Sequence, residues 1–451
     1  MLYTNYQSLK KLNRNLNGLK FLLNDYSIET MPHWICFQNT YSCNLSCPHC
    51  QFHGTEEAKK KYNDKILNMK DELLKKVASE VLPFAGEYML TVGGEPLVLK
   101  GIENTIHELE KYGAKLHLIT NGTLLRKRML EILLPYTGGY YISIDGATES
   151  TFETLRKGAK FKKVLKNVKL LKRSLELLSL ENENLVILAF TIMGSNIQEM
   201  PEMVRLASFW GVNTVNGNFV VIMHDHVAHE AIEFHKPRYN YYYTKAKELA
   251  TDLDINFDFP PPFEGVAPDP TYNHNFDQMI IKKGLNDSNR IPPPYRSYLN
   301  LPQVEAEALE LATAIRNKNA NRKQIEYDET NKDLYGKMKI VYEKLIHENK
   351  NLLQELTAKL DQKVKFCNYL FRTAYVASKG EVSPCCIGGR PDMGNVSHNS
   401  MFQVWNGEKF NNFRKSYFSQ NPEPCCQTCQ YNVNIPLMSI FQQFALPLSY
   451  D

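Results

Sequence analysis

The sequence predicts an α/β protein whose first half folds as an open, TIM-like barrel of six β-α units, a partial (β/α)6 barrel. Strand-like apolar segments alternate with helix-like stretches, and six such pairs fit between residues 33 and 225. Parallel strands need crossover helices, so this alternating order is typical of a parallel sheet. Closed barrels of this type have eight units, and six therefore favour an open barrel.

Each predicted strand is a short, largely apolar run, and the first four end in glycine or polar residues. They are expected at 33–40 (HWICFQNT), 87–94 (EYMLTVGG), 115–122 (KLHLITNG), 140–146 (YYISIDG), 185–193 (LVILAFTIM) and 215–223 (VNGNFVVIM). Between the first two strands, the spacing predicts one charged helix of about two dozen residues from Glu56 to Ser79. Cys36 lies inside the first strand, and we expect it to be a core residue.

Residues 226–362 differ in composition and read as an insertion. Aromatic and proline-rich stretches come first, among them 239–243 (YNYYY), 259–263 (FPPPF) and 291–295 (IPPPY), and proline runs favour extended loops. The stretch from 301 to 362 is polar and helical. Its apolar residues recur at helical spacing and predict one packed face: Leu334, Met338, Val341, Leu345, Leu352, Leu356 and Leu360.

Four regions follow from this reading. They are an N-terminal helical segment (1–32), the barrel (33–225), an insertion that is first aromatic and proline-rich and then helical (226–362), and a small α+β C-terminal domain (363–451). The insertion is expected either to shape a substrate site or to recruit a partner.

Charge and hydropathy exclude several classes of protein. The chain has 53 basic and 49 acidic residues, a balance that does not indicate a nucleic-acid partner. It has no run of eighteen apolar residues, so we expect no membrane-spanning helix. The N-terminus lacks the apolar segment of a signal peptide, which predicts a cytoplasmic protein.

The ten cysteines form two tight groups instead of being spread along the chain. Four lie between positions 36 and 50, and six lie between 367 and 429. Disulfides are rare in the reducing cytoplasm, so the two groups indicate two metal or cluster sites.

The first group has the spacing C-x3-C-x2-C, formed by Cys43, Cys47 and Cys50. Three thiolates can hold three irons of a cubane cluster and leave the fourth iron open to chelate a small molecule. The alternative is a zinc site, but zinc usually takes four ligands, and His49 lies between two of the cysteines where its geometry would be poor. The pattern therefore favours an iron–sulfur cluster.

Four further motifs follow the cysteines in order: 91–96 (TVGGEP), 118–122 (LITNG), 143–146 (SIDG) and 156–158 (RKG). With the cysteine spacing, they resemble the radical S-adenosylmethionine (SAM) superfamily over residues 33–225. The resemblance implies a catalytic [4Fe–4S] cluster on the three cysteines with SAM bound beside it. The residues it places at SAM are His49, Gly93, Gly94, Glu95, Pro96, Thr120, Asn121, Ser143, Asp145, Arg156 and Val221.

The resemblance also implies roles for these residues. The glycines of the second motif would let the backbone approach the methionine amino group, and Glu95 would supply charge. Ser143 or Asp145 would lie near the ribose or the carboxylate of SAM. Arg156 would pair with that carboxylate, because a guanidinium binds a carboxylate with two hydrogen bonds. Val221 would pack against adenine, although core packing explains an apolar residue there equally well.

The second cysteine group resembles the SPASM and Twitch extensions of radical SAM enzymes, with Gly380 and the segment around Trp405 between its cysteines. A full SPASM pattern continues with more cysteines, whereas none follows Cys429, so we expect a Twitch-like domain with one auxiliary [4Fe–4S] cluster. The expected ligands are Cys367, Cys385, Cys426 and Cys429. A four-cysteine zinc site is the alternative.

Cys386 and Cys425 each adjoin an expected ligand. Neighbouring residues in a strand point to opposite faces, so only one of each pair is expected to ligate the cluster. Either of the two could replace its neighbour as a ligand, or could serve as a catalytic thiol that donates a hydrogen atom.

The implied chemistry is reductive cleavage of SAM to a 5′-deoxyadenosyl radical, which abstracts a hydrogen atom from a substrate carbon. Dehydrogenation or epimerisation of a small-molecule or sugar-like substrate is the first expectation, with an electron donor such as flavodoxin or ferredoxin. A peptide maturase that makes thioethers, crosslinks or epimers is the alternative. The stretch before the first strand is too short for the leader-binding domain of many maturases. A non-catalytic scaffold with zinc in both groups is the rival of another class.

The segment His224-Asp-His226-Val-Ala-His229 follows the sixth predicted strand, at the expected mouth of the barrel. Imidazoles at alternating positions can ligate a metal. Metal binding, contact with the substrate or proton transfer, and a plain loop are the three interpretations that the sequence leaves open.

Overall fold

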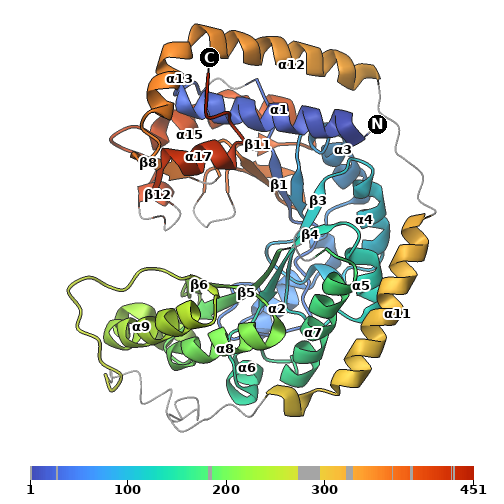
Figure 1. Ribbon diagram of the computed structural model, residues 1–451, viewed down its shortest axis with the longest axis vertical. Helices are drawn as coiled ribbons and strands as arrows, with labels where there is room; N and C mark the ends of the chain where they lie inside the picture. The colour runs from blue at the N-terminus through green and yellow to red at the C-terminus, as the bar shows by residue number, and fades with distance from the viewer. Residues whose placement is uncertain are drawn as a thin grey trace.

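A computed structural model of the protein describes residues 3–26, 29–180, 185–272, 295–320, 329–367, 369–385, 390–427, 429 and 432–450. Its ribbon forms a C-shaped molecule in which helices cover the outside of a curved sheet (Figure 1).

A ten-stranded sheet forms the centre, in the order β11-β10-β9-β1-β2-β3-β4-β5-β6-β7. The strands are β1 (Trp34–Phe37), β2 (Glu87–Met89), β3 (Lys115–Thr120), β4 (Thr137–Ser143), β5 (Leu185–Ile192), β6 (Thr214–Phe219), β7 (Asn256–Asp258), β9 (Thr373–Val376), β10 (Glu381–Ser383) and β11 (Gly394–Asn395). From β1 to β7 each strand pairs in parallel with the next. The predicted open α/β barrel is confirmed, and the insertion adds the seventh parallel strand.

The crossover helices lie on the outer side of this sheet (Figure 1). They are α3 (Asp71–Val81), α4 (Ile102–Glu110), α5 (Lys127–Leu133), α6 (Glu149–Leu155), α7 (Phe161–Leu177) and α8 (Met200–Trp210). Helix α3 shows why they pack there: Leu74, Val77, Ala78 and Val81 recur at helical spacing and are all buried. The barrel core is built from such stripes and from the apolar residues of the strands.

The predicted single helix from Glu56 to Ser79 is wrong, because the chain breaks in the middle. Helix α2 (Glu56–Tyr62) begins at Thr55, whose hydroxyl accepts the N–H of Ala58, and a short 3-10 turn (Lys65–Leu67) separates it from α3. Asn63 ends α2, and its side-chain oxygen accepts the N–H of Cys43 at 2.9 Å. The residue that caps the end of α2 thus bonds to the backbone of the first cysteine in the group.

The aromatic part of the insertion is also more regular than its composition predicts. The tyrosines of 239–243 lie in helix α9 (Lys236–Asp252), not in an extended loop, and Tyr239 is fully buried. The 291–294 part of the last proline run lies outside the described residues.

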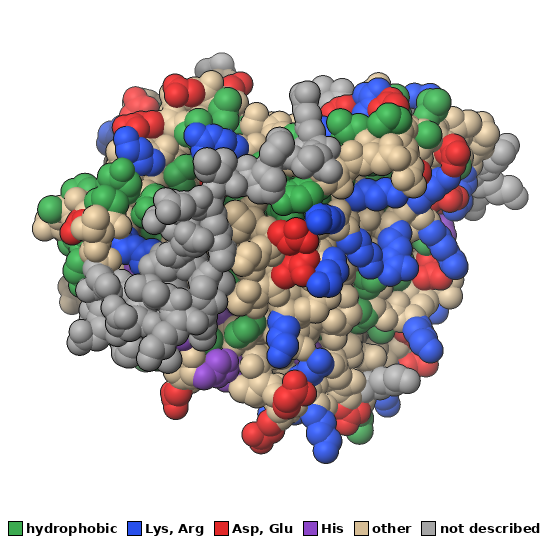
Figure 2. Space-filling model, turned by 90° about the horizontal axis from the view of Figure 1, so that it is seen from below, with side chains coloured by type: hydrophobic (Ala, Val, Ile, Leu, Met, Phe, Trp, Pro, Cys, Tyr) green, Lys and Arg blue, Asp and Glu red, His purple; other side chains and the backbone are tan. Residues whose placement is uncertain are grey.

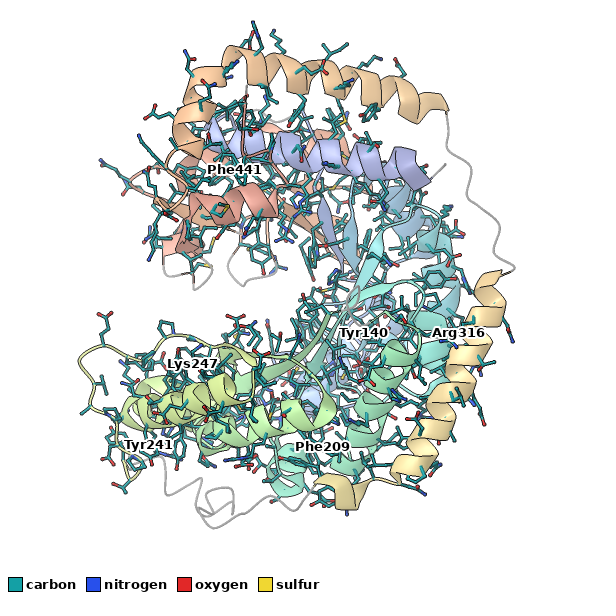
Figure 3. All side chains as sticks on the ribbon, in the orientation of Figure 1. Tyr140, Phe209, Tyr241, Lys247, Arg316 and Phe441 are labelled. Carbon is teal, nitrogen blue, oxygen red and sulfur yellow. The ribbon has the colours of Figure 1, made fainter. Side chains whose placement is uncertain are left out.

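The helical part of the insertion runs along the outside of the barrel and then over its N-terminal helix (Figure 1). Helix α11 (Leu301–Ala320) lies against α7 and α5, and Arg316 donates to the carbonyl oxygen of Leu177 (Figure 3). Helix α12 (Glu329–Glu348) packs on α1 (Tyr3–Leu22), where Met338 is buried against α1.

The predicted apolar face of this region holds only in part. Leu334 and Leu345 pack on α1, as expected, whereas Val341 and Leu352 are 36% and 41% exposed. Helix α12 ends at Glu348, and α13 (Lys350–Thr357) starts a new axis that buries Leu353 instead. One helical period therefore cannot describe both helices.

The C-terminal region forms the expected small α+β unit, but three of its strands extend the barrel sheet. Strand β9 pairs in parallel with β1, and β10 and β11 continue from it. Strands β8 (Lys363–Cys367) and β12 (Asn432–Pro436) form a separate antiparallel pair. The helices are α14 (Met401–Trp405), α15 (Glu408–Tyr417), α16 (Pro424–Gln427) and α17 (Leu437–Gln443).

The surface carries both signs of charge, as the composition indicates. Figure 2 shows Lys and Arg side chains interspersed with Asp and Glu over the face seen from below. Within the part of the chain that the structure describes, no helix is both long and apolar enough to cross a membrane.

Candidate active site

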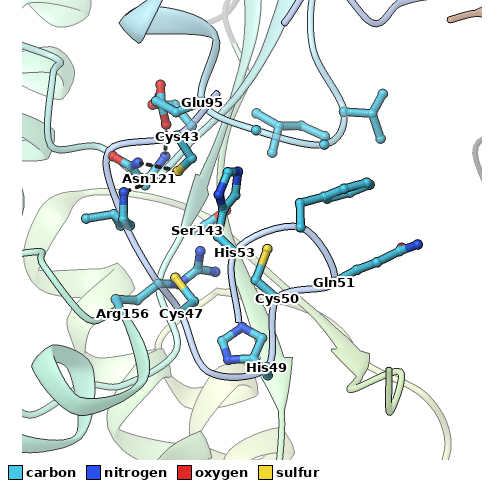
Figure 4. A pocket seen from close by; sticks show the side chains of 17 residues that line it. Cys43, Cys47, His49, Cys50, Gln51, His53, Glu95, Asn121, Ser143 and Arg156 are labelled. Carbon is cyan, nitrogen blue, oxygen red and sulfur yellow. Dashed lines mark hydrogen bonds between the residues drawn. The ribbon is translucent and has the colours of Figure 1, made fainter. Parts of the chain in front are cut away.

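The carboxyl ends of β1 to β4 surround a cavity of about 240 Å³ (Figure 4). The first cysteine group and the motifs that follow β2, β3 and β4 meet in it. Its lining includes Cys43, Cys47, His49, Cys50, Phe52, His53, Gly93, Gly94, Glu95, Thr120, Asn121, Ser143 and Arg156. The carboxyl ends of parallel strands are where α/β barrels carry their active sites.

The three cysteines lie on one loop after β1 and line the same cavity (Figure 4). Burial raises the pKa of the Cys43 thiol to about 11 and that of Cys47 to about 12. Both are therefore neutral thiols at neutral pH when no metal is bound, and ligation has to release their protons. Three soft sulfur donors around one cavity fit an iron–sulfur cluster.

Two histidines from the segment that follows β6 bond to the backbone of this cysteine loop. His224 Nε2 lies 3.0 Å from the carbonyl oxygen of Cys50, and His226 Nε2 lies 3.1 Å from that of Pro48. A carbonyl oxygen only accepts, so both Nε2 atoms must carry the proton. A side chain at Gly54 would place its Cβ 2.6 Å from the Pro48 oxygen and 2.9 Å from the His224 ring, so only glycine fits there.

Of the three interpretations of the histidine segment, the geometry supports a loop that holds the cysteines. The rings of His224 and His226 stack at 5.5 Å, and His229 is buried beside Glu230 at 3.4 Å. Among the described residues, no three His, Cys, Asp or Glu side chains meet closely enough to hold one metal ion.

Removing both histidine contacts should loosen the cluster loop. We expect the His224→Ala, His226→Ala protein to keep its fold but to lose iron roughly thirtyfold faster in air, since two hydrogen bonds contribute about 2 kcal/mol together and every 1.4 kcal/mol is a factor of about ten. Iron retention after anaerobic reconstitution is the measurement. His347→Ala, on the exposed face of α12, is the matched control. Unchanged retention in the double variant would contradict the role of the two rings.

The glycine motif after β2 is held by a buried residue that the sequence analysis missed. Gln38 Oε1 accepts the N–H of Val92 at 3.2 Å and of Gly93 at 3.0 Å, and its Nε2 donates to the Gly93 oxygen at 3.0 Å. Gly94 has φ +149°, a conformation that disfavours side chains. A glutamine within an apolar strand was the only available signal.

Glu95 lies in the pocket, but its carboxylate is engaged by the chain itself. It accepts the hydroxyl of Thr120 at 2.8 Å and the N–H of Asn121 at 2.7 Å. Burial raises its pKa to about 7. These contacts show Glu95 joining the ends of β2 and β3.

Asp145 and Arg156 form a buried ion pair under the cysteine loop. Asp145 Oδ2 lies 2.5 Å from Arg156 Nε and 3.3 Å from His49 Nε2, and its Oδ1 accepts the N–H of Thr191 at 2.9 Å. Burial alone would raise the pKa of Asp145, but the Arg156 guanidinium and His49 outweigh it and hold that pKa well below its usual range. Arg156 is predicted to pair with the carboxylate of SAM. In the structure it already pairs with the carboxylate of Asp145.

The structure brings eight of the eleven residues expected at SAM to the cavity lining. They are His49, Gly93, Gly94, Glu95, Thr120, Asn121, Ser143 and Arg156. Pro96, Asp145 and Val221 are not in the lining. Pro96 is buried at the start of a 3-10 turn, and Asp145 lies beneath Arg156. Strand β6 ends at Phe219, so Val221 has left the sheet and is 66% exposed.

The second cysteine group converges from three elements. Cys367 ends β8, Cys385 follows β10, Cys426 lies in α16 and Cys429 follows it. Burial raises the pKa of the Cys367 thiol, and repulsion by Cys429 and Cys425 raises it further. Burial also raises the pKa of the Cys426 thiol, and Cys425, Cys367 and Cys385 raise it further, so the expected ligands lie within electrostatic reach of one another.

Cys425 lies directly beside the expected ligand Cys426. Its Sγ lies 4.0 Å from that of Cys426, because the two residues lie on a helical turn and not in a strand with opposite faces. The choice between Cys425 and Cys426 stays open. Cys386 lies outside the described residues. Cys36 is buried between Met89 and Tyr375, which confirms it as a core residue.

Two family models match this chain. Residues 39–207 match the radical SAM superfamily, and residues 367–430 match the SPASM iron-sulfur cluster-binding domain. The first match covers the cavity and its motifs, and the second covers the C-terminal cysteines. The expected cofactors are confirmed: a [4Fe–4S] cluster with SAM, and iron–sulfur in the C-terminal domain.

Curated relatives match only part of the chain. The GTP 3′,8-cyclase of Peptoclostridium acidaminophilum is 31% identical over 132 residues, 29% of this chain and 39% of its own. The subtilosin biosynthesis protein AlbA of Bacillus subtilis is 27% identical over 194 residues, 42% of this chain and 40% of its own. The chain thus matches about two fifths of the length of these relatives.

Similarity in structure extends further than similarity in sequence. The crystal structure of Streptococcus suis SuiB bound to its precursor peptide SuiA has a TM-score of 0.50 at 14% identity, over 93% of this chain and 72% of SuiB. At that identity the likeness shows a shared fold. The cysteine loop, the motifs around the cavity and the two family matches agree: the chain carries a radical SAM domain at residues 39–207 and a SPASM iron–sulfur cluster-binding domain at residues 367–430.

Proposed function

We propose that this enzyme cleaves SAM reductively and oxidises a substrate carbon. The observation that carries the proposal is the second cysteine group, whose thiols lie within electrostatic reach of one another. The motifs expected at SAM accompany the first cysteine group and not this one. When bound, the [4Fe–4S] cluster and SAM together supply a 5′-deoxyadenosyl radical that removes a hydrogen atom from the substrate.

The catalytic cluster is proposed to bind to Cys43, Cys47 and Cys50. Arg156 lines the cavity next to these thiols, and its positive charge favours the thiolate form of Cys47. It would offset the negative charge of the ligands and of the SAM carboxylate. Gly93 and Gly94 would present backbone to the methionine part of SAM, and Phe52 closes the cavity over Gly93.

The auxiliary cluster is proposed to bind to Cys367, Cys385, Cys426 and Cys429. Four protein thiolates leave no open iron, so the chemistry it supplies is electron transfer. A substrate that has lost a hydrogen atom either loses an electron and a proton, which is oxidation, or regains a hydrogen atom, which is epimerisation. An electron acceptor favours oxidation. The external donor, expected to be a flavodoxin or ferredoxin, stays a prediction.

Two observations favour different substrates. AlbA takes part in biosynthesis of a bacteriocin, and it matches this chain over the longer stretch, which favours a peptide substrate. GTP 3′,8-cyclase acts on a nucleotide, which favours a small molecule as the second candidate. Oxidation that forms a thioether or a crosslink in a peptide has the same electron balance as a small-molecule dehydrogenation.

Cell-extract fractions separate these possibilities. The reduced holoenzyme is incubated with SAM and each fraction, and the fraction that holds the substrate is expected to speed the formation of 5′-deoxyadenosine. The product in that fraction should be lighter than the substrate by two hydrogen atoms. Stimulation that survives digestion of the fraction by a protease would exclude a peptide. A product of unchanged mass, with hydrogen exchanged from solvent, would replace oxidation by epimerisation.

Loss of the auxiliary site should separate SAM cleavage from product formation. We expect Cys429→Ala to bind about half of the iron, to form 5′-deoxyadenosine as before, and to make less than about 1% of the product, since one thiolate of four is missing. Cys36→Ala is the matched control, because Cys36 belongs to neither site. Full product formation by Cys429→Ala would show that the C-terminal site takes no part in the reaction.

A further inference from the structure

A second cavity, of about 330 Å³, lies at the opposite end of the barrel from the cysteines. Residues at the amino ends of β1, β2 and β3 line it together with helix α1 and the chain just before β9. Three parts of the sequence therefore meet there: the N-terminal helix, the barrel and the C-terminal extension.

The lining of this cavity is strongly basic. Five cationic side chains and one carboxylate contribute to it: Lys10, Lys11, Arg14, Lys115, Arg372 and Glu87. Glu87 lies 3.7 Å from Arg372 and 3.8 Å from His117, so its single charge is shared between two partners. One carboxylate cannot neutralise Arg14, Lys115 and Arg372 together.

The buried Lys10 and the half-buried Arg14 donate their hydrogen bonds to backbone oxygens. The Lys10 ammonium is 6% exposed and donates to the carbonyl oxygen of Tyr112 at 2.6 Å. Burial lowers its pKa to about 7. The Arg14 guanidinium donates to the carbonyl oxygens of Gln443 and Gln442. A carbonyl satisfies a donor but does not neutralise a positive charge, and burying such a charge is costly, which is why the pKa of Lys10 falls.

Like charges also face one another across the cavity. Burial lowers the pKa of Arg14, repulsion by Arg372 lowers it further, and the Glu87 carboxylate offsets part of this effect. His33 lies beside both arginines, is 5% exposed, and neither ring nitrogen has a hydrogen-bond partner among the described residues. A doubly charged anion between these groups would relieve the repulsion and give donors a partner.

We propose that this cavity binds a tetrahedral oxyanion, the phosphate group of a small metabolite. A dianion matches the excess of positive charge better than a single carboxylate, and arginine forks suit phosphate oxygens. The volume equals that of roughly ten water molecules in the liquid, which leaves room for an ester group beside the phosphate. The bound phosphate would tie helix α1 and the C-terminal extension to the barrel.

The test uses the reconstituted holoenzyme without turnover, so it does not depend on the proposed reaction. Inorganic phosphate, acetate and sodium chloride are compared at equal ionic strength, by titration calorimetry and by the thermal midpoint. We expect phosphate to bind and to raise the midpoint, and acetate and chloride to do neither. Equal effects of phosphate and chloride, or of phosphate and acetate, would overturn the proposal.

Two variants locate the site. Arg14→Gln and Lys115→Gln should each weaken phosphate binding about tenfold, since each removes a charge-assisted contact worth about 1.4 kcal/mol. Lys163→Gln, on the exposed face of α7, is the matched control and should bind phosphate as the unmodified protein does. If phosphate binds both cavity variants with unchanged affinity, the anion does not occupy this cavity and the proposal fails.

Discussion

Replacing Cys47 by alanine will abolish SAM cleavage and remove half of the iron. The thiol is buried in the cavity between Arg156 and the other two cysteines, and two remaining thiolates cannot hold the cluster. We expect about four irons per chain instead of about eight, and 5′-deoxyadenosine formation below one thousandth of that of the unmodified enzyme. Iron analysis and chromatography of the reaction mixture measure both.

The matched control for this variant is Cys36→Ala, which removes a buried cysteine of strand β1 that belongs to neither group of expected ligands. It should keep all of its iron and its activity. Continued SAM cleavage by Cys47→Ala would show that the cavity holds a different ligand set.

Breaking the buried ion pair under the cysteine loop should have the largest effect on stability. Asp145→Asn keeps the size of the side chain and the acceptor for Thr191, but leaves the Arg156 charge without its partner. Removing one member of a buried pair costs about 3–5 kcal/mol. We expect that loss in the free energy of unfolding of the apoprotein by urea, where cluster loss does not contribute.

A double-mutant cycle isolates the pair. Asp145→Asn combined with Arg156→Gln removes both charges, and it should recover part of the stability lost by the single variant. A cost below about 1 kcal/mol for Asp145→Asn would mean that water or another group already compensates Arg156.

The barrel could be predicted because its signal is local. Each strand has its own apolar run, and each crossover helix has its own row of apolar residues at helical spacing. Residues 33–225 can therefore be divided into strands and helices without knowing their tertiary contacts. The catalytic cavity follows from topology, since motifs that end parallel strands must meet at one edge.

The contacts that the sequence could not reveal are those between distant segments. The pairing of β9 with β1 joins Thr373 to Trp34 across more than three hundred residues, and no local pattern announces it. The contacts of His224 and His226 with the cysteine loop could not be predicted either, because the spacing of these histidines resembles that of a metal site.

For two site residues, the sequence motif does not contain the physical reason for what the structure shows. Val221 was expected on a strand that in fact ends at Phe219, and strand ends depend on the partner strand. Glu95 does line the cavity, but Thr120 and Asn121 also bind its oxygens, a contact that depends on where β3 ends and that the motif does not reveal.

The central claim is that this chain holds an open catalytic cluster and one auxiliary cluster. Anaerobic reconstitution, iron and sulfide analysis, and EPR of the reduced protein with and without SAM test it directly. The account predicts about eight irons per chain and a signal that SAM changes. Zinc without iron in both sites, or an iron signal that SAM leaves unchanged, would contradict it.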